Sequence, residues 1–450
     1  MKLTYFYNII GFLCSLSIFP ALSMQSHAEN KIEFNGVTYN LSESTVLLDA
    51  EGIYEHDDAC KDPIEAFNRI NNIGPDAILL VAPSVYWLDD PDDPDVRTDR
   101  GGTPYAVRIN CEHLKIIGLS DNPEDFVFAV NRGQTQGAVG NFTMFHFTGS
   151  SLEIGNITFG NYCNIDLVYP RNTELNRDKR KDAIVQAQIG ICQNTDRLYA
   201  ENCRFISRLN LCPFIGARRS LYDNCYFECT DDALSGSAVY LDCKFKFFSS
   251  KPFYSTAETG AVFLNCDIEC LGSGVQYFTK VPGKITVINT RFHSKDPIEI
   301  KWTRDASDII CRQMNNTLNG IPYIIDSDRL DLGPELSDSS IKDAYLIEDN
   351  DRIVYNLPNL LSGDDDWDPK GINSLVKQLE SKYGRKLTGI PVSLRIKSDK
   401  TTLKAVNDTA RILSTPLLWG SYEADDPSIT TYVSENTSPE EKEMVIRIST

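Results

Sequence analysis

One short motif recurs six times between residues 156 and 292, and it constrains the fold more than any other feature of this chain. Each copy has Asn or Asp first and an aromatic or aliphatic residue fourth, and four copies have Cys second. The copies begin at Asn156, Asn202, Asn224, Asp242, Asn265 and Asn289, at steps of 46, 22, 18, 23 and 24 residues. If the first step holds two units, the mean period is about 22 residues, which is typical of stacked solenoid coils.

The motif and the apolar run before it have the pattern of β-strands. In Asn202-Cys-Arg-Phe205, for example, the thiol and the phenyl ring are two residues apart and share one face, while Arg204 faces the other way. The apolar runs are short and rich in β-branched and aromatic residues, and they lack a helical period. We therefore predict an all-β chain, with a right-handed parallel β-helix over residues 29–325.

The small polar and thiol positions of the motif predict two further features. Asn tolerates the left-handed backbone of tight turns, so stacked coils are expected to align these residues into a ladder. Cys203, Cys225, Cys243 and Cys266 are expected to form an interior stack of buried thiols. Disulfides between adjacent coils remain open, because coils about 4.8 Å apart are within reach of such a bond.

Charge limits the partners of the chain. The formal net charge of −19 argues against nucleic acid as the main partner, because phosphate binding needs a basic surface. An acidic polysaccharide remains compatible, because basic residues gather between Arg171 and Lys251. The alternative is that these cations are ordinary solvated residues on the outer face of the strands.

Both ends of the chain differ from the repeat region. Residues 1–28 combine Lys2 with an apolar run from Ile9 to Leu22 and predict a signal peptide, hence a secreted or periplasmic protein without a membrane span. Lipidation at Cys14 is less expected, because bulky Phe12 and Leu13 precede it. Residues 326–389 are expected to be an irregular acidic linker with a short helix, and residues 390–450 a small β-rich domain or cap. We expect a monomer.

Between Asp62 and Phe292 the chain resembles the pectin methylesterases. Arg219-Ser-Leu-Tyr-Asp-Asn-Cys225 is similar to the family's Arg-Gln-Phe-Tyr-Arg-Asp-Cys, and Thr259-Gly-Ala-Val-Phe-Leu-Asn-Cys266 to its Thr-Gly-Phe-Val-Phe-Gln-Asn-Cys. The resemblance implies a right-handed parallel β-helix that hydrolyses the methyl esters of galacturonan, without a cofactor or metal. The implied substrate is an acidic plant polysaccharide such as pectin.

The same resemblance implies a set of catalytic residues. The family uses an Asp nucleophile, a second Asp as proton donor and glutamines that stabilise the oxyanion. Thr230-Asp-Asp-Ala-Leu-Ser-Gly236 aligns with Val-Asp-Phe-Ile-Phe-Gly and assigns Asp232 as nucleophile, while Gln186 aligns with an oxyanion glutamine. Asn210 occupies the position of the proton donor and Leu209 that of the second glutamine, so proton donation would move to Asp231.

The family's Leu-Gly-Arg-Pro-Trp motif, whose Arg orients the nucleophile, is replaced by Gly274-Val-Gln-Tyr-Phe-Thr-Lys280. This substitution leaves Lys280 as the nearest cation. Together with three arginines of the basic region, Lys280 completes the predicted substrate contacts: Arg208, Arg218, Arg219 and Lys280.

Three other interpretations stay open. Asn194-Thr-Asp196 and Asp231-Asp232 faintly resemble motifs of polygalacturonase-like hydrolases, in which two carboxylates flank a glycosidic bond. A polysaccharide lyase would need calcium and a base such as Arg218 or Lys280. A glycan-binding β-helix without catalysis would use Asp231 and Asp232 only as turn residues, because neighbours on a regular strand face opposite ways and share one surface only at a turn or bulge.

Overall fold

The computed structural model describes residues 31–392 apart from positions 43, 55, 93–104, 134–141, 181–185, 209, 235, 257–259, 306–310, 338 and 391. Beyond these it describes the backbone of four strands, β30 (Leu394–Asp399), β31 (Thr402–Asn407), β32 (Ile429–Ser434) and β33 (Glu443–Ile448), paired as two hairpins. The signal peptide predicted at 1–28 lies outside the described residues.

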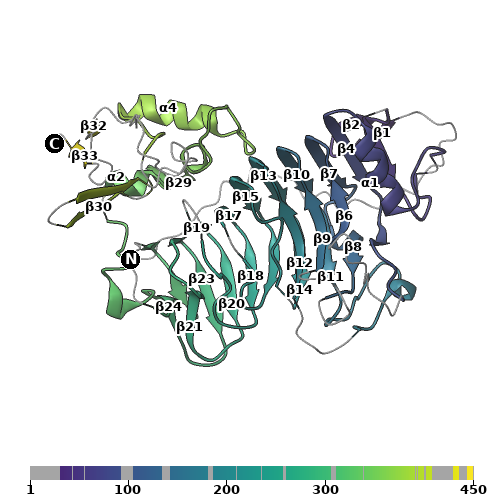
Figure 1. The fold of residues 1–450 in the computed structure, drawn as a ribbon, viewed down its shortest axis with the longest axis horizontal. Coiled ribbons are helices and arrows are strands. Elements are labelled where there is room, and N and C mark those ends of the chain that lie inside the picture. The colour runs from purple at the N-terminus through teal and green to yellow at the C-terminus, as the bar shows by residue number, and fades with distance from the viewer. Residues whose placement is uncertain are drawn as a thin grey trace.

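Stacked coils form a parallel β-helix, as the repeat predicts (Figure 1). The first sheet pairs ten parallel strands, one from each coil: β3 (Thr45–Leu48), β4 (Asp76–Val81), β7 (His113–Gly118), β10 (Ser151–Gly155), β13 (Arg197–Glu201), β15 (Arg219–Asp223), β17 (Ala238–Leu241), β19 (Ala261–Leu264), β22 (Ile285–Ile288) and β25 (Arg312–Met314).

The second sheet follows the first in each coil from β4 onward, and its strands stack in the same order. Its members are β5 (Ser84–Trp87), β8 (Phe126–Val130), β11 (Thr158–Asn161), β14 (Arg204–Ser207), β16 (Tyr226–Cys229), β18 (Lys244–Phe247), β20 (Asp267–Cys270), β23 (Arg291–Ser294), β26 (Thr317–Leu318) and the antiparallel β27 (Ile321–Pro322). A third face is less regular: β6 (Tyr105–Ile109), β9 (Phe142–Phe147) and β12 (Ala187–Cys192) pair at one end, and β21 (Gly274–Thr279) and β24 (Ile298–Thr303) at the other.

The 46-residue step of the repeat is one coil, not the two that a constant period would require. β10 pairs directly with β13, with Ser151 opposite Arg197, so no strand of the first sheet lies between them. The extra length is an insertion at residues 162–180 that packs Tyr162, Leu167 and Tyr169 onto the outer face of the second sheet.

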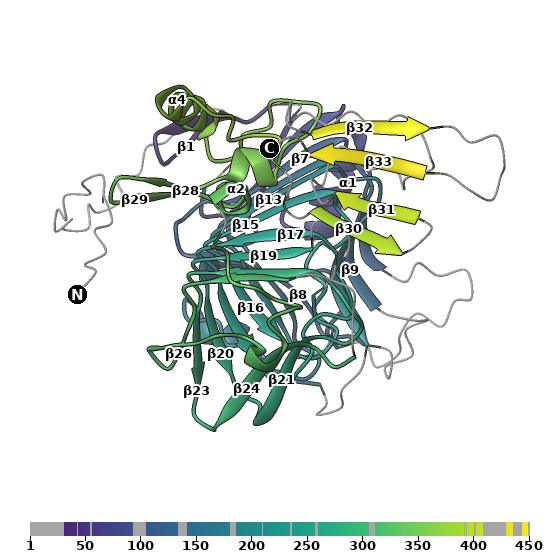
Figure 2. The same ribbon diagram turned by 90° about the vertical axis from the view of Figure 1, so that its left-hand side faces the viewer.

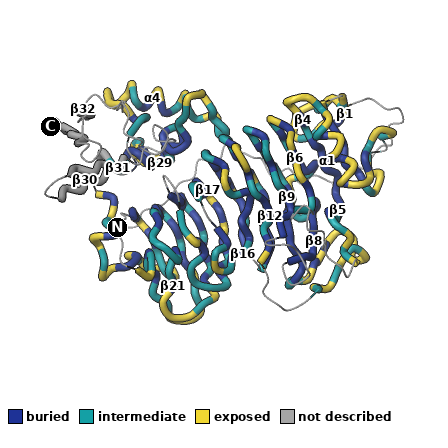
Figure 3. The backbone as a smooth tube through the Cα atoms, in the orientation of Figure 1, coloured by how far each residue is buried: buried dark blue, intermediate teal, exposed yellow. Residues whose placement is uncertain are grey.

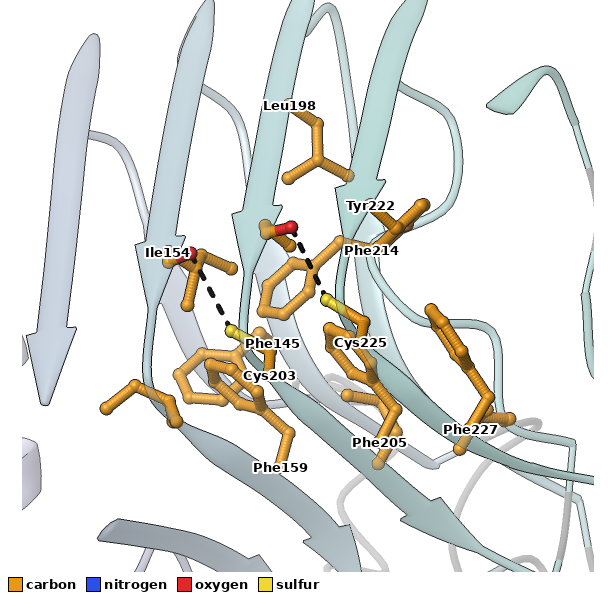
Figure 4. Packing of buried hydrophobic residues seen from close by; sticks show 14 of the residues in the cluster. Phe145, Ile154, Phe159, Leu198, Cys203, Phe205, Phe214, Tyr222, Cys225 and Phe227 are labelled. Carbon is orange, nitrogen blue, oxygen red and sulfur yellow. Dashed lines mark hydrogen bonds between the residues drawn. The ribbon is translucent and has the colours of Figure 1, made fainter. Parts of the chain in front are cut away.

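The interior is a column of apolar side chains, and Figure 3 shows buried residues along the coils. On the second sheet Phe159, Phe205, Phe227 and Phe245 stack with ring centroids 5.7, 5.1 and 4.7 Å apart. Figure 4 shows the first three of these rings. The cysteines form the predicted buried stack beside these rings, and the thiol of Cys225 donates to the Ala200 carbonyl at 3.4 Å. All twelve described cysteines are free thiols, so the structure contains no disulfide within its described residues.

The predicted Asn ladder is present at the turn between the first and second sheets. All six first residues of the motif adopt φ between +50° and +59°. Their side chains bond from coil to coil: Asn202 donates to Asn156 at 2.8 Å, and Asn224 donates to Asn202 at 3.3 Å. Asn accepts this conformation more readily than other residues with a Cβ, which explains why the motif keeps it.

Helix α1 (Pro63–Asn72) covers the first coil, with Asp62 capping the Glu65 amide at 2.8 Å. Beside it, β1 (Lys31–Phe34) and β2 (Val37–Asn40) form a hairpin. No helix among the described residues has the length and apolar character needed to cross a membrane.

The segment expected to be an irregular linker is folded onto the β-helix. It contains α2 (Ser339–Asp343), the hairpin β28 (Leu346–Asp349) and β29 (Arg352–Tyr355), α3 (Leu357–Leu360) and α4 (Asn373–Tyr383), and it lies beside the first sheet (Figures 1 and 2). Its apolar residues, such as Leu357 and Leu361, pack against outward-facing Leu221, Val239 and Val262 of that sheet. Those strands are therefore covered on both faces, which explains their continuous apolar runs. We call residues 326–392 the lateral segment.

Candidate functional site

The third face changes character between β12 and β21, and the predicted nucleophile lies there. Across residues 210–215, 231–234 and 251–253 the regular pairing is reduced to single bridges, such as Leu234 with Phe253. Four residues other than glycine have positive φ in this region: Cys212 (43°), Phe214 (50°), Asp232 (53°) and Lys251 (63°). Strained backbone of this kind is concentrated at functional sites. We call this region the interrupted face, because the regular pairing of strands is interrupted here.

A turn on the interrupted face brings two adjacent carboxylates to the same side of the chain. Asp231 and Asp232 form a turn one residue after the end of β16, and the left-handed backbone of Asp232 breaks the strand alternation that would separate them. The Asp232 amide remains bonded to the Lys251 carbonyl of the next coil at 3.0 Å. Both carboxylates therefore face the same cation.

That cation is Lys280, which directly follows β21. Its Nζ lies 2.7 Å from Oδ2 of Asp232 and 3.8 Å from Oδ2 of Asp231. The hydrogen bond to Asp232, more than any other contact, raises the pKa of the Lys280 ammonium. Asp232 is 22% exposed and Asp231 is 52% exposed. Oδ1 of Asp232 is shielded from solvent and has no hydrogen-bond partner within the described part of the chain, so Oδ2 is its bonded and accessible oxygen.

A polar row leads to Asp232 from the preceding coils and includes a residue that sequence reasoning missed. Thr143 donates to Oε1 of Gln188 at 3.2 Å, and the thiol of Cys212 lies 3.8 Å from the Asp232 carbonyl oxygen. Burial, followed by the charge of Asp232, raises the pKa of Cys212 to about 12, and a hydrogen bond with Gln188 opposes that rise. Gln188 is thus linked through the Cys212 thiol to the backbone of Asp232. Its two-residue spacing from Gln186 was the available signal, since residues two apart in an extended chain point the same way.

The other predicted members of the catalytic set occupy neighbouring coils. Gln186 is exposed just before β12, and Asn210 is half-buried on the next coil. The Cys212 amide donates to the Ala233 carbonyl at 2.7 Å, so Asn210 and Asp232 belong to adjacent coils. Leu209, assigned to the second glutamine position, lies outside the described residues. The roles of Gln186 and Asn210 stay predictions.

The predicted substrate contacts lie in three places. Besides Lys280, Arg208 lies close to the interrupted face, with its guanidinium carbon 4.0 Å over the Phe248 ring and its Nε 3.4 Å from Glu228. The Phe248 amide bonds to the Cys229 carbonyl, which puts Phe248 opposite Thr230, the residue before Asp231.

Arg218 and Arg219 form a separate ion cluster at the first sheet. Both donate to Asp196 at 2.9 Å through Nε, and buried Arg219 also binds Asp365 of the lateral segment at 2.5 Å. Burial raises the pKa of Asp196, but the bonds from the two arginines outweigh it and hold that pKa below its usual value. These contacts show how the lateral segment is anchored, and substrate binding by this pair stays a prediction.

The described residues contain no group of three or more His, Cys, Asp or Glu side chains arranged to hold a metal ion. The chemistry that the site displays is that of two carboxylates, one ammonium group and nearby amides.

Comparison with known proteins adds evidence on the fold. No family model matches the sequence, and no curated protein is similar to it in sequence. Among solved structures, a mutant pectin methylesterase in complex with a hexasaccharide matches with a TM-score of 0.50 at 13% identity, covering 75% of this chain and 99% of the other. The carrot pectin methylesterase gives 0.44 at 12% identity, covering 70% and 91% of the two chains. PemA from Erwinia chrysanthemi gives 0.41 at 12%, covering 75% and 99%. The chain is therefore similar to pectin methylesterases in its parallel β-helix fold.

Proposed function

We propose that this protein hydrolyses the methyl esters of galacturonan in pectin, with Asp232 as the nucleophile. The observation that carries the proposal is the ion pair of Asp232 with Lys280 on the interrupted face. In the resembling family an Arg orients the nucleophilic carboxylate, and Lys280 offers a cation at hydrogen-bond distance for the same purpose. The shared fold supports this assignment.

In the proposed reaction the Asp232 carboxylate attacks the ester carbonyl carbon. The tetrahedral intermediate loses methanol and leaves an acyl-enzyme, which water then hydrolyses to the free galacturonate and regenerated Asp232. Asp231 is the second carboxyl at the site, and it would give the proton to departing methanol and take one from the attacking water. Amide groups of Gln186, Gln188 and Asn210 are the candidate donors to the oxyanion.

The proposed function also includes an extracellular or periplasmic location and a monomeric enzyme. Pectin is an extracellular polymer, so an enzyme that acts on it has to be exported. The signal peptide predicted at residues 1–28 and the predicted secreted or periplasmic location are consistent with this proposal. A monomer suffices, because the proposed catalytic residues all come from one chain.

Glycan binding without hydrolysis is a second candidate function. Asn210 favours it, because an amide stands where the resemblance requires a proton donor. In that case Asp231 and Asp232 would hold the turn and contact the sugar but would not transfer protons.

The products formed from methyl-esterified pectin decide between these functions. We expect purified protein to release methanol without new reducing ends or unsaturated sugars. New reducing ends would indicate a glycoside hydrolase and unsaturated ends a lyase, and either would replace the esterase proposal. Retained pectin binding with no product would favour the glycan-binding function.

A further inference from the structure

The last strand of the first sheet, β25, presents a buried arginine to the lateral segment. Gln313 points toward the core, where its side-chain amide donates to the carbonyls of Ile325 and Gly333 at 3.0 and 2.7 Å. Side chains alternate along a strand, so Arg312 and Met314 point outward, and Met314 packs against the apolar residues that hold the lateral segment. Arg312 is only 6% exposed at this junction.

The guanidinium group of Arg312 has no counter-ion among the residues that the structure describes. Its Nε is shielded from solvent and has no hydrogen-bond partner there, and its Nη1 donates to the carbonyl of adjacent Cys311 at 3.4 Å, which is long for such a bond. Glu335 forms a parallel bridge with Gln313 and so faces the same side as Gln313, away from Arg312. Burial lowers the pKa of the Arg312 guanidinium, and the groups that oppose this effect are Tyr345 and Cys311, not a carboxylate.

The groups that cover Arg312 are neutral. Thr286 lies opposite Arg312 on β22, and its hydroxyl donates to Oη of Tyr345 at 3.2 Å. The Tyr345 hydroxyl in turn donates to the Val392 carbonyl at 3.0 Å. Both hydroxyl hydrogens are therefore engaged within the protein, and neither group can neutralise the guanidinium.

A guanidinium group cannot escape this position by losing its proton, because its pKa lies above about 12. A buried charge without a partner is strongly unfavourable, and the planar fork of an arginine fits an oxyanion through two parallel hydrogen bonds. We propose that Arg312 binds a small oxyanion of the phosphate or sulfate class between the β-helix and the lateral segment. This site lies on the outer side of the first sheet, so the proposal is independent of the chemistry at Asp232.

Thermal unfolding of the full chain in chloride buffer, with phosphate or sulfate added at constant ionic strength, tests the proposal. An anion that binds only the folded protein stabilises it by mass action. We expect the wild-type melting temperature to rise by about 3 °C at a hundredfold excess of anion over its dissociation constant. The anions are kept at millimolar concentrations, because both stabilise proteins non-specifically when concentrated.

Two methionine variants separate the site from general salt effects. Arg312→Met should lose the response to phosphate, and in chloride alone it should be at least as stable as wild type, because it removes an unpaired buried charge. Arg329→Met should keep the full response. Arg329 is a cation of the same lateral segment, but it is 42% exposed and already paired with Asp331 at 3.1 Å.

The absence of a response to either anion in wild type, or an equal response in Arg312→Met, would overturn the proposal. A folded Arg312→Met that is less stable than wild type in chloride alone would also overturn it, because the chain itself would then supply the counter-charge. If Arg312→Met does not fold, Arg312→Lys decides. It keeps the charge without the fork, and calorimetric titration should show phosphate binding at least about tenfold weaker than in wild type, whereas equal affinity would contradict the proposal.

Discussion

At the scale of the residue, the candidate site depends on one backbone conformation and one ion pair. Asp232 has φ +53°, a conformation that Asp adopts more readily than most residues, and this turn brings its carboxylate to the same cation as Asp231. The sequence indicated that two adjacent aspartates share one surface only at a turn or bulge, and the structure has that turn. Lys280 was predictable as the nearest cation because it replaces an Arg of the resembling family.

Lys280 is a positioning residue for Asp232, and its charge should matter more than its shape. Lys280→Met should lower kcat for methanol release about 100-fold with a smaller effect on KM, because the carboxylate loses the group that orients it. Lys280→Arg should recover most of that activity, since a guanidinium also binds a carboxylate. Steady-state kinetics of both variants check this. Equal losses in the two variants would assign Lys280 a merely structural role.

The parts of the site that the sequence missed depend on contacts between coils. Gln188 lies two residues after Gln186, and its side chain accepts a hydrogen bond from Thr143, 45 residues earlier, which the sequence could not reveal. The burial of Arg219 against Asp365 could not be foreseen either, because the two residues are 146 positions apart.

At the scale of the element, the turns of the β-helix were more predictable than its period. Asn at the first position of the motif indicated a left-handed turn by its own chemistry, and all six copies have one. The 46-residue step was ambiguous, because a degenerate coil and an inserted loop give the same spacing. The pairing of Ser151 with Arg197 resolves it in favour of the insertion.

The Asn ladder predicts the order of stability of wild type and two variants at Asn224, whose φ is +50°. Asn224→Ala should lower the free energy of unfolding by about 1–2 kcal/mol, because a Cβ without a compensating polar group disfavours this conformation. Asn224→Gly should cost less, since glycine adopts the left-handed region freely although it too loses the bond to Asn202. Urea unfolding checks both, and an Ala variant at least as stable as the Gly variant would contradict the account.

At the scale of the whole molecule, the lateral segment is part of the β-helix unit. Its apolar residues show no regular period because they fit the outer face of the first sheet, so the sequence indicated only an irregular linker. A signal was present in the continuous apolar run Ala238-Val-Tyr-Leu241, which is typical of strands buried on both faces.

Acid should weaken the attachment of this segment through Asp365. The hydrogen bond from Arg219 lowers the pKa of the Asp365 carboxyl to about 2, well below the usual value for an aspartate. A carboxyl with a lowered folded-state pKa stabilises the protein fully above its unfolded pKa, and this contribution is lost as the pH falls through the folded value. Asp365→Asn should therefore melt at a lower temperature than wild type at pH 7, with the difference shrinking between about pH 4 and pH 2. A difference that is absent at pH 7, or constant down to low pH, would contradict this role.

The most direct test of the central claim is methanol release from methyl-esterified pectin by three proteins: wild type, Asp232→Asn and Asp331→Asn. Asp331 is the control because it is also an aspartate in an ion pair, with Arg329 at 3.1 Å, but it lies outside the interrupted face. If Asp232 is the nucleophile, Asp232→Asn should reduce release roughly a thousandfold or more, while Asp331→Asn keeps the wild-type rate. Near wild-type release by folded Asp232→Asn would contradict the claim that this carboxylate performs the chemistry.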